Sequence, residues 1–223
     1  MKKVLVAFLL CIGMIFTGCL KSNKDFGQPQ QKITSDTIVN GNYWAFNIGD
    51  SHADIYTKAQ ELREEKKIKT ISVVNNVFTN LTAIKDKLPL YHALFLDATT
   101  ATANGIQLYF ENGKVKNIYN NAGQLLSSWP WGAGSGNIIR SEDPVNTIYD
   151  KLVEIKKITE YSPYFQRMSM FYKDIATAYD VDMDQSSQWL FTSPVSEKVF
   201  LQINFKFKNY VVDSIMVDRV EEL

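Results

Sequence analysis

The residues of this chain that could do acid–base or nucleophilic chemistry are few. Its two histidines are His52 and His92, and neither falls in an HxxxH, HExxH or carboxylate-rich spacing of the kind that metal and hydrolase sites use. His52 lies in the first turn of a predicted helix, and His92 lies in an apolar stretch beside Tyr91. We therefore expect both to be structural and the chain to have no catalytic residue. The alternative, a hydrolase with an unfamiliar site, predicts a cleft where a histidine meets carboxylates.

An acidic run is the strongest candidate for a metal site. Asp180, Asp182 and Asp184 place carboxylates at positions one, three and five, as in the start of a calcium-binding EF-hand loop. Position six holds Gln185 where that loop needs glycine, and position twelve holds Phe191 where it needs a bidentate glutamate. The pattern favours a solvated acidic turn, so we expect no metal ion and no cofactor.

Four aromatic residues could form a contact surface. Trp129 and Trp131 flank Pro130 before a glycine-rich segment, and Tyr43 and Trp44 precede the first predicted helix. Exposed rigid rings recognise protein or sugar partners. The alternative is that both indoles fill a joint between two folded units. Buried tryptophans would argue against a sugar-binding role.

The first eighteen residues have the order of a bacterial export signal. Lys2 and Lys3 precede an uncharged apolar run at residues 4–16, which is too short to span a bilayer. Phe16-Thr17-Gly18-Cys19 follows, and this motif resembles a bacterial lipobox. The resemblance implies that residues 1–18 are removed as a signal peptide and that Cys19 carries the lipid anchor.

The residue after the lipobox bears on location. Leu20 stands where an aspartate would imply retention in the inner membrane. The resemblance therefore implies a lipid-anchored protein of the bacterial cell envelope, attached to the outer membrane.

Composition and charge exclude several classes of function. The cysteines are Cys11, in the signal segment, and Cys19, so the mature domain has no thiol for a disulfide or metal site. Removal of Lys2 and Lys3 leaves 22 basic and 24 acidic residues without a basic patch. Because a phosphate backbone needs a cationic footprint, we expect no nucleic-acid partner.

The body of the chain repeats itself weakly. Ile55-Tyr56-Thr57-Lys58 matches Ile148-Tyr149-Asp150-Lys151, and Phe110 to Ile118 matches Phe207 to Ile215, in the same order and with nearly constant spacing. We infer a polar flexible tether at 19–36, unit one at 37–124, a Trp/Gly-rich linker at 125–137 and unit two at 138–223. The alternative is two helices and two hairpins that share common residues.

Local patterns predict an α+β fold. Ser51 to Asp54 resembles a capping box that starts one helix, and Pro144 suits the first turn of another. Asn112-Gly113 between apolar runs predicts a hairpin, and residues 199–207 alternate as a half-buried strand. We expect each unit to be a helix, or a helix pair, packed on an antiparallel sheet of three to four strands. Residues 69–89 and 159–184 stay open between a second helix and an irregular strand.

Tandem helix-plus-sheet units, with Gly49-Asp50 at the entry and Phe110-Glu111-Asn112-Gly113-Lys114-Val115 in the hairpin, resemble the β-lactamase-inhibitor-protein fold and the small outer-membrane lipoproteins of the SmpA/OmlA type. Those families bind proteins and catalyse nothing.

From the resemblance we expect a non-catalytic, membrane-anchored protein-binding adaptor or inhibitor-like module whose partner is an envelope protein. Polar strand residues, Gln202, Asn204 and Lys206, would contribute to the contact. The alternative is a carbohydrate- or small-ligand-binding lipoprotein in which Trp129, Trp131 and Tyr43 stack on the ligand.

Overall fold

The computed structural model describes residues 30–100, 102–131 and 137–223, and it has an α+β architecture with a large antiparallel sheet, as predicted. The α-helices in this part are α1 (His52–Lys66) and α2 (Val145–Lys156), with short 3-10 helices η2 (Leu81–Ile84), η3 (Leu88–Leu90), η5 (Ser162–Phe165) and η6 (Val181–Gln185). The strands are β1 (Gln30–Ile38), β2 (Asn42–Tyr43), β3 (Phe46–Asn47), β4 (Thr70–Val73), β5 (Val77–Phe78), β6 (Tyr91–Asp97), β7 (Ile106–Glu111), β8 (Lys114–Asn120), β9 (Leu125–Leu126), β10 (Ser128–Trp129), β11 (Ile139–Arg140), β12 (Arg167–Asp174), β13 (Gln188–Pro194), β14 (Val199–Lys208) and β15 (Val211–Glu222).

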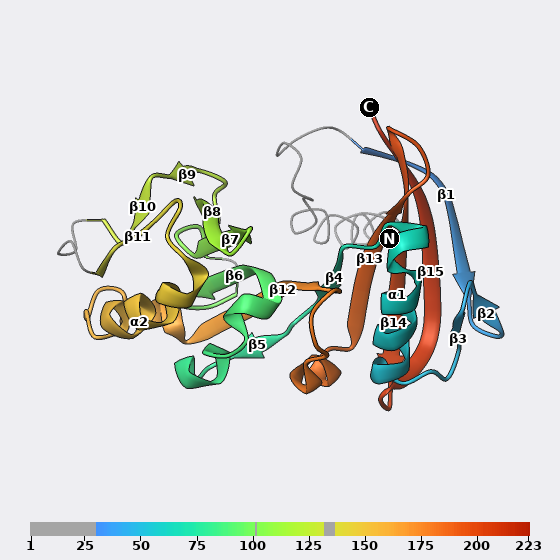
Figure 1. Ribbon diagram of the computed structural model, residues 1–223, viewed down its shortest axis with the longest axis horizontal. Coiled ribbons are helices and arrows are strands. Elements are labelled where there is room, and N and C mark those ends of the chain that lie inside the picture. Colours follow the sequence, from blue (N-terminus) through green and yellow to red (C-terminus); the bar gives the residue numbers. More distant parts are fainter. Residues whose placement is uncertain (1–29, 101, 132–136) are drawn as a thin grey trace, which may run out of the picture.

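The main sheet runs through two lobes without a break. Its order is β1-β15-β14-β13-β4-β12-β6-β7-β8-β9, with β5 paired to β12. In Figure 1 the right-hand lobe holds β1, β15, β14 and β13 with α1, and the left-hand lobe holds β6 to β9 with α2. The pair β4–β12 lies between them, and one hydrophobic core cluster includes residues of both lobes.

The two halves of the chain exchange elements across this junction. Helix α1 comes from the first half, but it packs on β13 and β14 of the second half. The ring of His52 contacts those of Trp189 and Phe207, and Ser193 Oγ donates to the Lys66 carbonyl. Strand β12 comes from the second half and pairs with β6 of the first. The expected division into two tandem units, each with its own helix on its own sheet, is not confirmed.

Helix α1 begins and ends at sequence-encoded signals. Ser51 caps it through a full capping box, because its hydroxyl accepts from the Asp54 N–H while the Asp54 carboxylate accepts from the Ser51 N–H. The helix ends at Lys67, which adopts the left-handed conformation. Ile55 and Ala59 are fully buried at helical spacing, so this face fixes the helix on the sheet.

Two hairpins have turns that require a positive φ. Asn112 and Gly113 connect β7 to β8, as the Asn-Gly signal predicts, with φ of 52° and 72°. Asn209 and Tyr210 connect β14 to β15 with φ of 53° and 66°. Tyrosine at the second of these positions is unusual, because a side chain raises the energy of this backbone conformation.

The second helix and the linker form the core of the left-hand lobe. Pro144 is the N-cap of α2, whose Ile148, Leu152 and Ile155 are fully buried. In the linker, β10 pairs with β11, and the Trp129 ring meets the rings of three residues around η5, namely Tyr161, Tyr164 and Phe165. This indole is therefore part of the core of the left-hand lobe, whereas the structural alternative placed both indoles in a joint between two units.

The start of the described chain differs from the expected tether. Residues 30–36 belong to β1, which pairs with β15 from Gln30↔Glu222 to Ile38↔Ile215. Its side chains are almost all exposed, so the strand is held by main-chain hydrogen bonds that a hydrophobic pattern cannot reveal. The open segments also resolve: 69–89 forms β4, β5 and 3-10 turns, and 159–184 forms β12 between 3-10 turns. Along 30–100, 102–131 and 137–223, no helix reaches the length and apolarity that a bilayer crossing takes.

Candidate functional site

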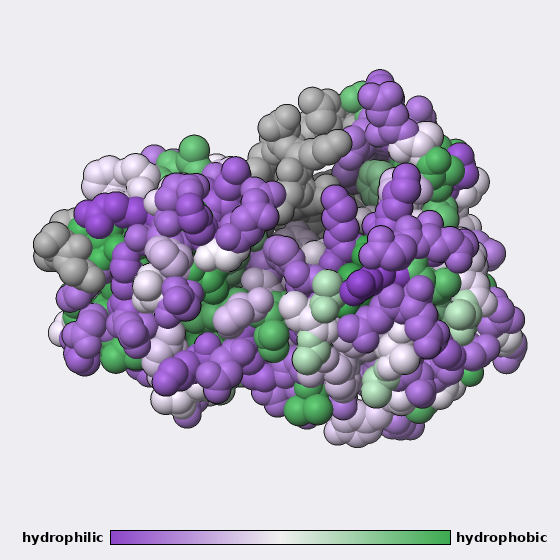
Figure 2. Space-filling model, in the orientation of Figure 1, coloured by the Kyte–Doolittle hydropathy of each residue, from purple (hydrophilic) through white to green (hydrophobic). Residues whose placement is uncertain are grey.

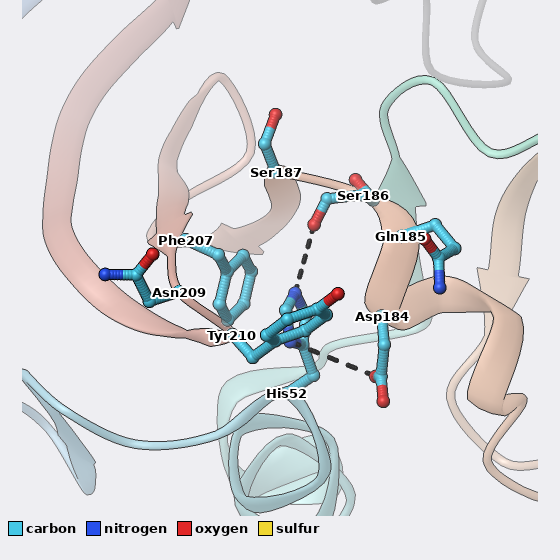
Figure 3. A pocket seen from close by; sticks show the side chains of 8 residues that line it. All are labelled: His52, Asp184, Gln185, Ser186, Ser187, Phe207, Asn209 and Tyr210. Atoms are coloured by element: carbon cyan, nitrogen blue, oxygen red, sulfur yellow. Dashed lines mark hydrogen bonds and ion pairs between the residues drawn. The ribbon is translucent and has the colours of Figure 1, made fainter.

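Two hollows adjoin at the β14–β15 turn, at the lower end of the right-hand lobe in Figure 1. The first has a volume of about 240 Å³ and is polar and aromatic, lined by His52, Asp184, Gln185, Ser186, Ser187, Phe207, Asn209 and Tyr210 (Figure 3). The second, of about 430 Å³, has a mixed polar and aliphatic lining of Val39, Ile48, Gly49, Lys208, Asn209, Val211, Val212 and Asp213. Asn209 lines both, so the turn separates them.

His52 enters the first hollow from the first turn of α1 and is 3% exposed. Its Nε2 lies 3.0 Å from the Ser186 carbonyl oxygen, which accepts a hydrogen bond from a protonated Nε2. The ring stacks on Phe207 with centroids 3.6 Å apart. Burial lowers the pKa of His52, against backbone hydrogen bonds with Ser186 and Tyr210 and the charge of Asp184, which raise it. The imidazole is therefore neutral at pH 7.

Asp184 faces His52 across the hollow, with 3.9 Å between Oδ1 and His52 Nδ1. That distance is too long for a hydrogen bond. The Tyr179 hydroxyl donates to the same carboxylate oxygen, and burial together with this negatively charged acceptor raises the pKa of Tyr179. The hollow thus contains a histidine beside a carboxylate, which is the pairing that the hydrolase alternative predicts.

Neither serine of the hollow is placed to act as the nucleophile of a hydrolase. The Ser186 hydroxyl donates to the carbonyl oxygens of Val74 and Gln188, at 2.6 and 2.8 Å. In Figure 3 the Ser187 side chain points away from His52. Since His52 Nε2 is engaged with a main-chain carbonyl, the histidine does not activate either serine.

The other histidine has a separate environment at the junction of the lobes. His92 Nε2 lies 3.3 Å from Asp174 Oδ2, and its Nδ1 lies 3.2 Å from the Phe110 carbonyl oxygen. The imidazole therefore links β6 to the end of β12. A structural role accounts for both of its ring contacts.

The acidic run forms η6 in place of a calcium loop. Asp180 and Asp182 both pair with Lys87, at 2.5 and 2.9 Å, while Asp184 turns into the first hollow. Asp180 and Asp182 thus share one lysine, and Asp184 faces away from them. Across the described ranges no group of three or more His, Cys, Asp or Glu side chains is arranged to hold a metal ion.

A buried polar network lies near the Asp180–Lys87 pair, where the lobes meet. Lys173 is fully buried in β12, and its Nζ donates to the Tyr56 hydroxyl at 2.9 Å, to the Asp174 carbonyl at 3.1 Å and to the Thr177 hydroxyl. Burial lowers the pKa of Lys173 to about 8, despite Asp174 and Asp180 nearby. Burial also raises the pKa of Tyr56 to about 12. Sequence alone gives no signal for a buried lysine.

The aromatic candidates separate in space. Trp129 is 3% exposed, whereas Trp131 is 66% exposed in the left-hand lobe. Tyr43 and Trp44 lie half-buried at the β2–β3 hairpin, stacked on each other at 5.0 Å. Phe191 of β13 and the Lys66 ammonium also contact Trp44. Trp129 is therefore not available to stack on a sugar.

The remaining residues that the sequence pointed to are the polar residues of β14 and Cys19. Of the polar residues on β14, Lys206 is exposed, Gln202 is half-buried, and Asn204 is 7% exposed. Cys19, the lipidation candidate, lies outside the described residues. The hollows at the β14–β15 turn were missed because their residues come from distant segments, although exposed Tyr210 at a turn was a possible signal.

Comparisons with protein-family models, with curated proteins and with solved structures give no match to this chain.

Proposed function

We propose that this chain is a non-catalytic, membrane-anchored lipoprotein of the bacterial cell envelope that binds a protein partner through the β14–β15 turn. The observation that carries the proposal is a group of exposed apolar residues beside the two hollows. Val39, Tyr210 and Val211 are 57%, 66% and 38% exposed, and all three line one or other hollow. We call this surface, with the hollows, the tip surface.

The distribution of apolar residues on the face shown in Figure 2 supports the choice of the tip surface as the contact site. Figure 2 shows a mostly hydrophilic face with hydrophobic residues in small separate groups. Single exposed apolar side chains are normal, but apolar side chains gathered beside hollows are typical of contact sites. A rigid turn that presents a tyrosine also orders few new groups on binding, which lowers the entropic cost.

The polar geometry supports binding over hydrolysis. The His52 ring is neutral, it donates to a carbonyl, and the nearby Ser186 hydroxyl is held by main-chain acceptors. A hydrolytic site needs a nucleophile within hydrogen-bond reach of its base. The polar groups of this hollow instead fix the turn, α1 and the 184–187 segment against one another.

The tip surface lies at the opposite end of the right-hand lobe from Gln30, the first described residue. Strand β1 begins at Gln30, eleven residues after Cys19, and Gln30 pairs with Glu222 at the end of β15. The tip lies at the other end of that 12-residue strand, roughly 40 Å away at about 3.3 Å per residue. A lipid on Cys19 would hold this end near the membrane and direct the tip away from it. Anchoring would also raise the effective concentration for an envelope partner.

We also propose that the two halves are diverged copies of one unit. The order α1, β4, β6, β7, β8 parallels α2, β12, β13, β14, β15. The sheet order supports this, because β4 lies beside β13 of the other half and β12 lies beside β6 of the other half. In this proposal each copy has given its helix and following strand to the other.

Site-specific photo-crosslinking in native envelopes tests the function. A photoreactive phenylalanine analogue replaces Tyr210, and a matched control replaces Val195, which is also exposed but lies in the β13–β14 loop at the membrane-side end of the same lobe. We expect one reproducible adduct from position 210, none from 195, and loss of the adduct in Cys19→Ala. Equal adducts from both positions, or none from either, would contradict the proposal.

A further inference from the structure

The first hollow has a more specific chemistry than an apolar contact. Tyr210 is 66% exposed and contributes an aromatic ring, and Asp184 lies across the hollow with 38% of its side chain exposed (Figure 3). We infer that this hollow binds a basic side chain, lysine or arginine, of the partner protein. The inference rests on the proposed function and specifies what the tip surface recognises.

Asp184 supplies the negative charge of the hollow. Within the ranges that the structure describes, its carboxylate has the Tyr179 hydroxyl as donor and the His52 ring at 3.9 Å as its nearest basic group. That imidazole is neutral at pH 7, because burial lowers its pKa. The neighbouring carboxylates Asp180 and Asp182 share Lys87. Asp184 is thus an anion that a cation from outside can reach and pair with.

An aromatic ring beside this charge would strengthen the binding of a cation. An ammonium or guanidinium group gains energy over the face of an aromatic ring, and more so when a carboxylate lies nearby and water is displaced. In Figure 3 the Tyr210 ring lies beside His52, and it is the exposed ring of the hollow, because Phe207 is 8% exposed and stacks on the His52 ring. A basic side chain has an apolar stem as well, which suits a hollow whose lining is partly aromatic.

The backbone at Tyr210 agrees with a function for its ring. A non-glycine residue at φ 66° holds its backbone in a conformation of higher energy. The side chain, 66% exposed, recovers little of this through burial. Such strain is typical of residues that are held in place for recognition.

A competing expectation is an anionic guest, because α1 begins at this hollow. A helix N-terminus carries roughly half a positive charge. Here the Asp54 carboxylate accepts from the Ser51 N–H at 3.0 Å and from its hydroxyl at 2.6 Å, within the capping box. The full charges of Asp54 and Asp184 therefore outweigh the helix terminus, and the hollow favours a cation.

Amide-resolved NMR on the full chain in detergent micelles tests this. The probes are N-acetyl-arginine amide and N-acetyl-lysine amide, with N-acetyl-glutamine amide as the neutral comparison. We expect saturable shifts at His52, Asp184 and Tyr210 with the basic probes alone. Asp184→Asn should weaken binding at least ~10-fold, as the loss of a charge-assisted contact does. Glu64→Gln, which removes an exposed carboxylate near the C-terminal end of α1, away from the tip surface, should leave it unchanged.

The outcomes separate the inference from the function on which it rests. Absence of saturable shifts, or equal weakening by Asp184→Asn and Glu64→Gln, overturns the basic-side-chain inference. A partner adduct at position 210 that persists in Asp184→Asn also overturns it and leaves the protein-binding proposal standing. Selective, Asp184-dependent shifts without any adduct at position 210 support the cation site and contradict the partner proposal.

Discussion

Replacement of Lys173 by methionine should remove a pH dependence of stability that the buried lysine creates. Lys173 is fully buried, with its three donors on neutral acceptors, and burial lowers its pKa from 10.5 to about 8. Between these values the unfolded chain binds more protons at this site than the folded chain, so stability rises with pH. At pH 7 the buried charge costs about 3 kcal/mol, at 1.36 kcal/mol per unit. From pH 7 to about 9.5, roughly 2 kcal/mol of that cost is relieved.

The variant should keep the fold, because no donor is orphaned. Tyr56 still donates to the carbonyl of Asp174 or Thr177, and the Thr177 hydroxyl still donates to the Asp174 carbonyl. Replacement of a buried charged group by an apolar one of similar volume is often neutral or stabilising.

Urea unfolding of both proteins at about pH 7 and 9.5 measures the effect. The wild type should gain about 2 kcal/mol relative to Lys173→Met over this interval. Titrating groups that do not contact Lys173 cancel in the difference. Tyr56, whose pKa is raised to about 12, stays protonated in the folded protein over this interval. If the free-energy difference between the two proteins is the same at both pH values, Lys173 titrates alike in the folded and unfolded chains, and the reasoning fails.

Three other perturbations have defined outcomes. Trp129→Ala should cost about 3–5 kcal/mol of unfolding free energy, because the indole is buried among aromatic rings, while the exposed Trp131→Ala should stay within about 0.5 kcal/mol; equal losses of Tm would contradict this. Stability should fall as the pH drops below 6.5 and through the lowered pKa of His52, and His52→Phe should flatten that loss in thermal unfolding between about pH 7 and 5; an equally steep loss in the variant would exclude His52 as its source. A chain cut within residues 132–136 should stay assembled, and neither half should fold alone, because α1 and β4 of the first half pack on strands of the second. If the circular dichroism of the separate halves matched that of the folded protein, the exchange would be refuted.

Local elements were predictable because their signals are local. The capping box at Ser51, the proline before α2 and the Asn112-Gly113 turn each act within a few residues, and the structure has them where the sequence indicates. The alternation at 199–207 likewise indicates β14. Strand β1 was missed because its side chains are exposed on nearly every position and it depends on main-chain pairing.

Global features were not predictable for a related reason. A helix pattern indicates that one face is buried, but it does not indicate which sheet covers that face. The repeat therefore suggested two sequential units, whereas α1 packs on strands of the second half and β12 pairs with β6 of the first. The hollow at the tip brings together His52 and Asp184 from different halves of the chain. One sequence contains no pairwise information that would link them.

The pairing of β1 with β15 also determines how the protein bears a pulling force. The strands are antiparallel, and Gln30 at one end pairs with Glu222, while the turn before Val211 lies at the other end. A pull between Gln30 and the β14–β15 turn draws β1 and β15 in opposite directions along their own axes. Because ladder hydrogen bonds run across the strands, such a load shears the whole ladder at once and does not open it one bond at a time. A partner held at the turn would thus strain the lobe along its mechanically strong direction.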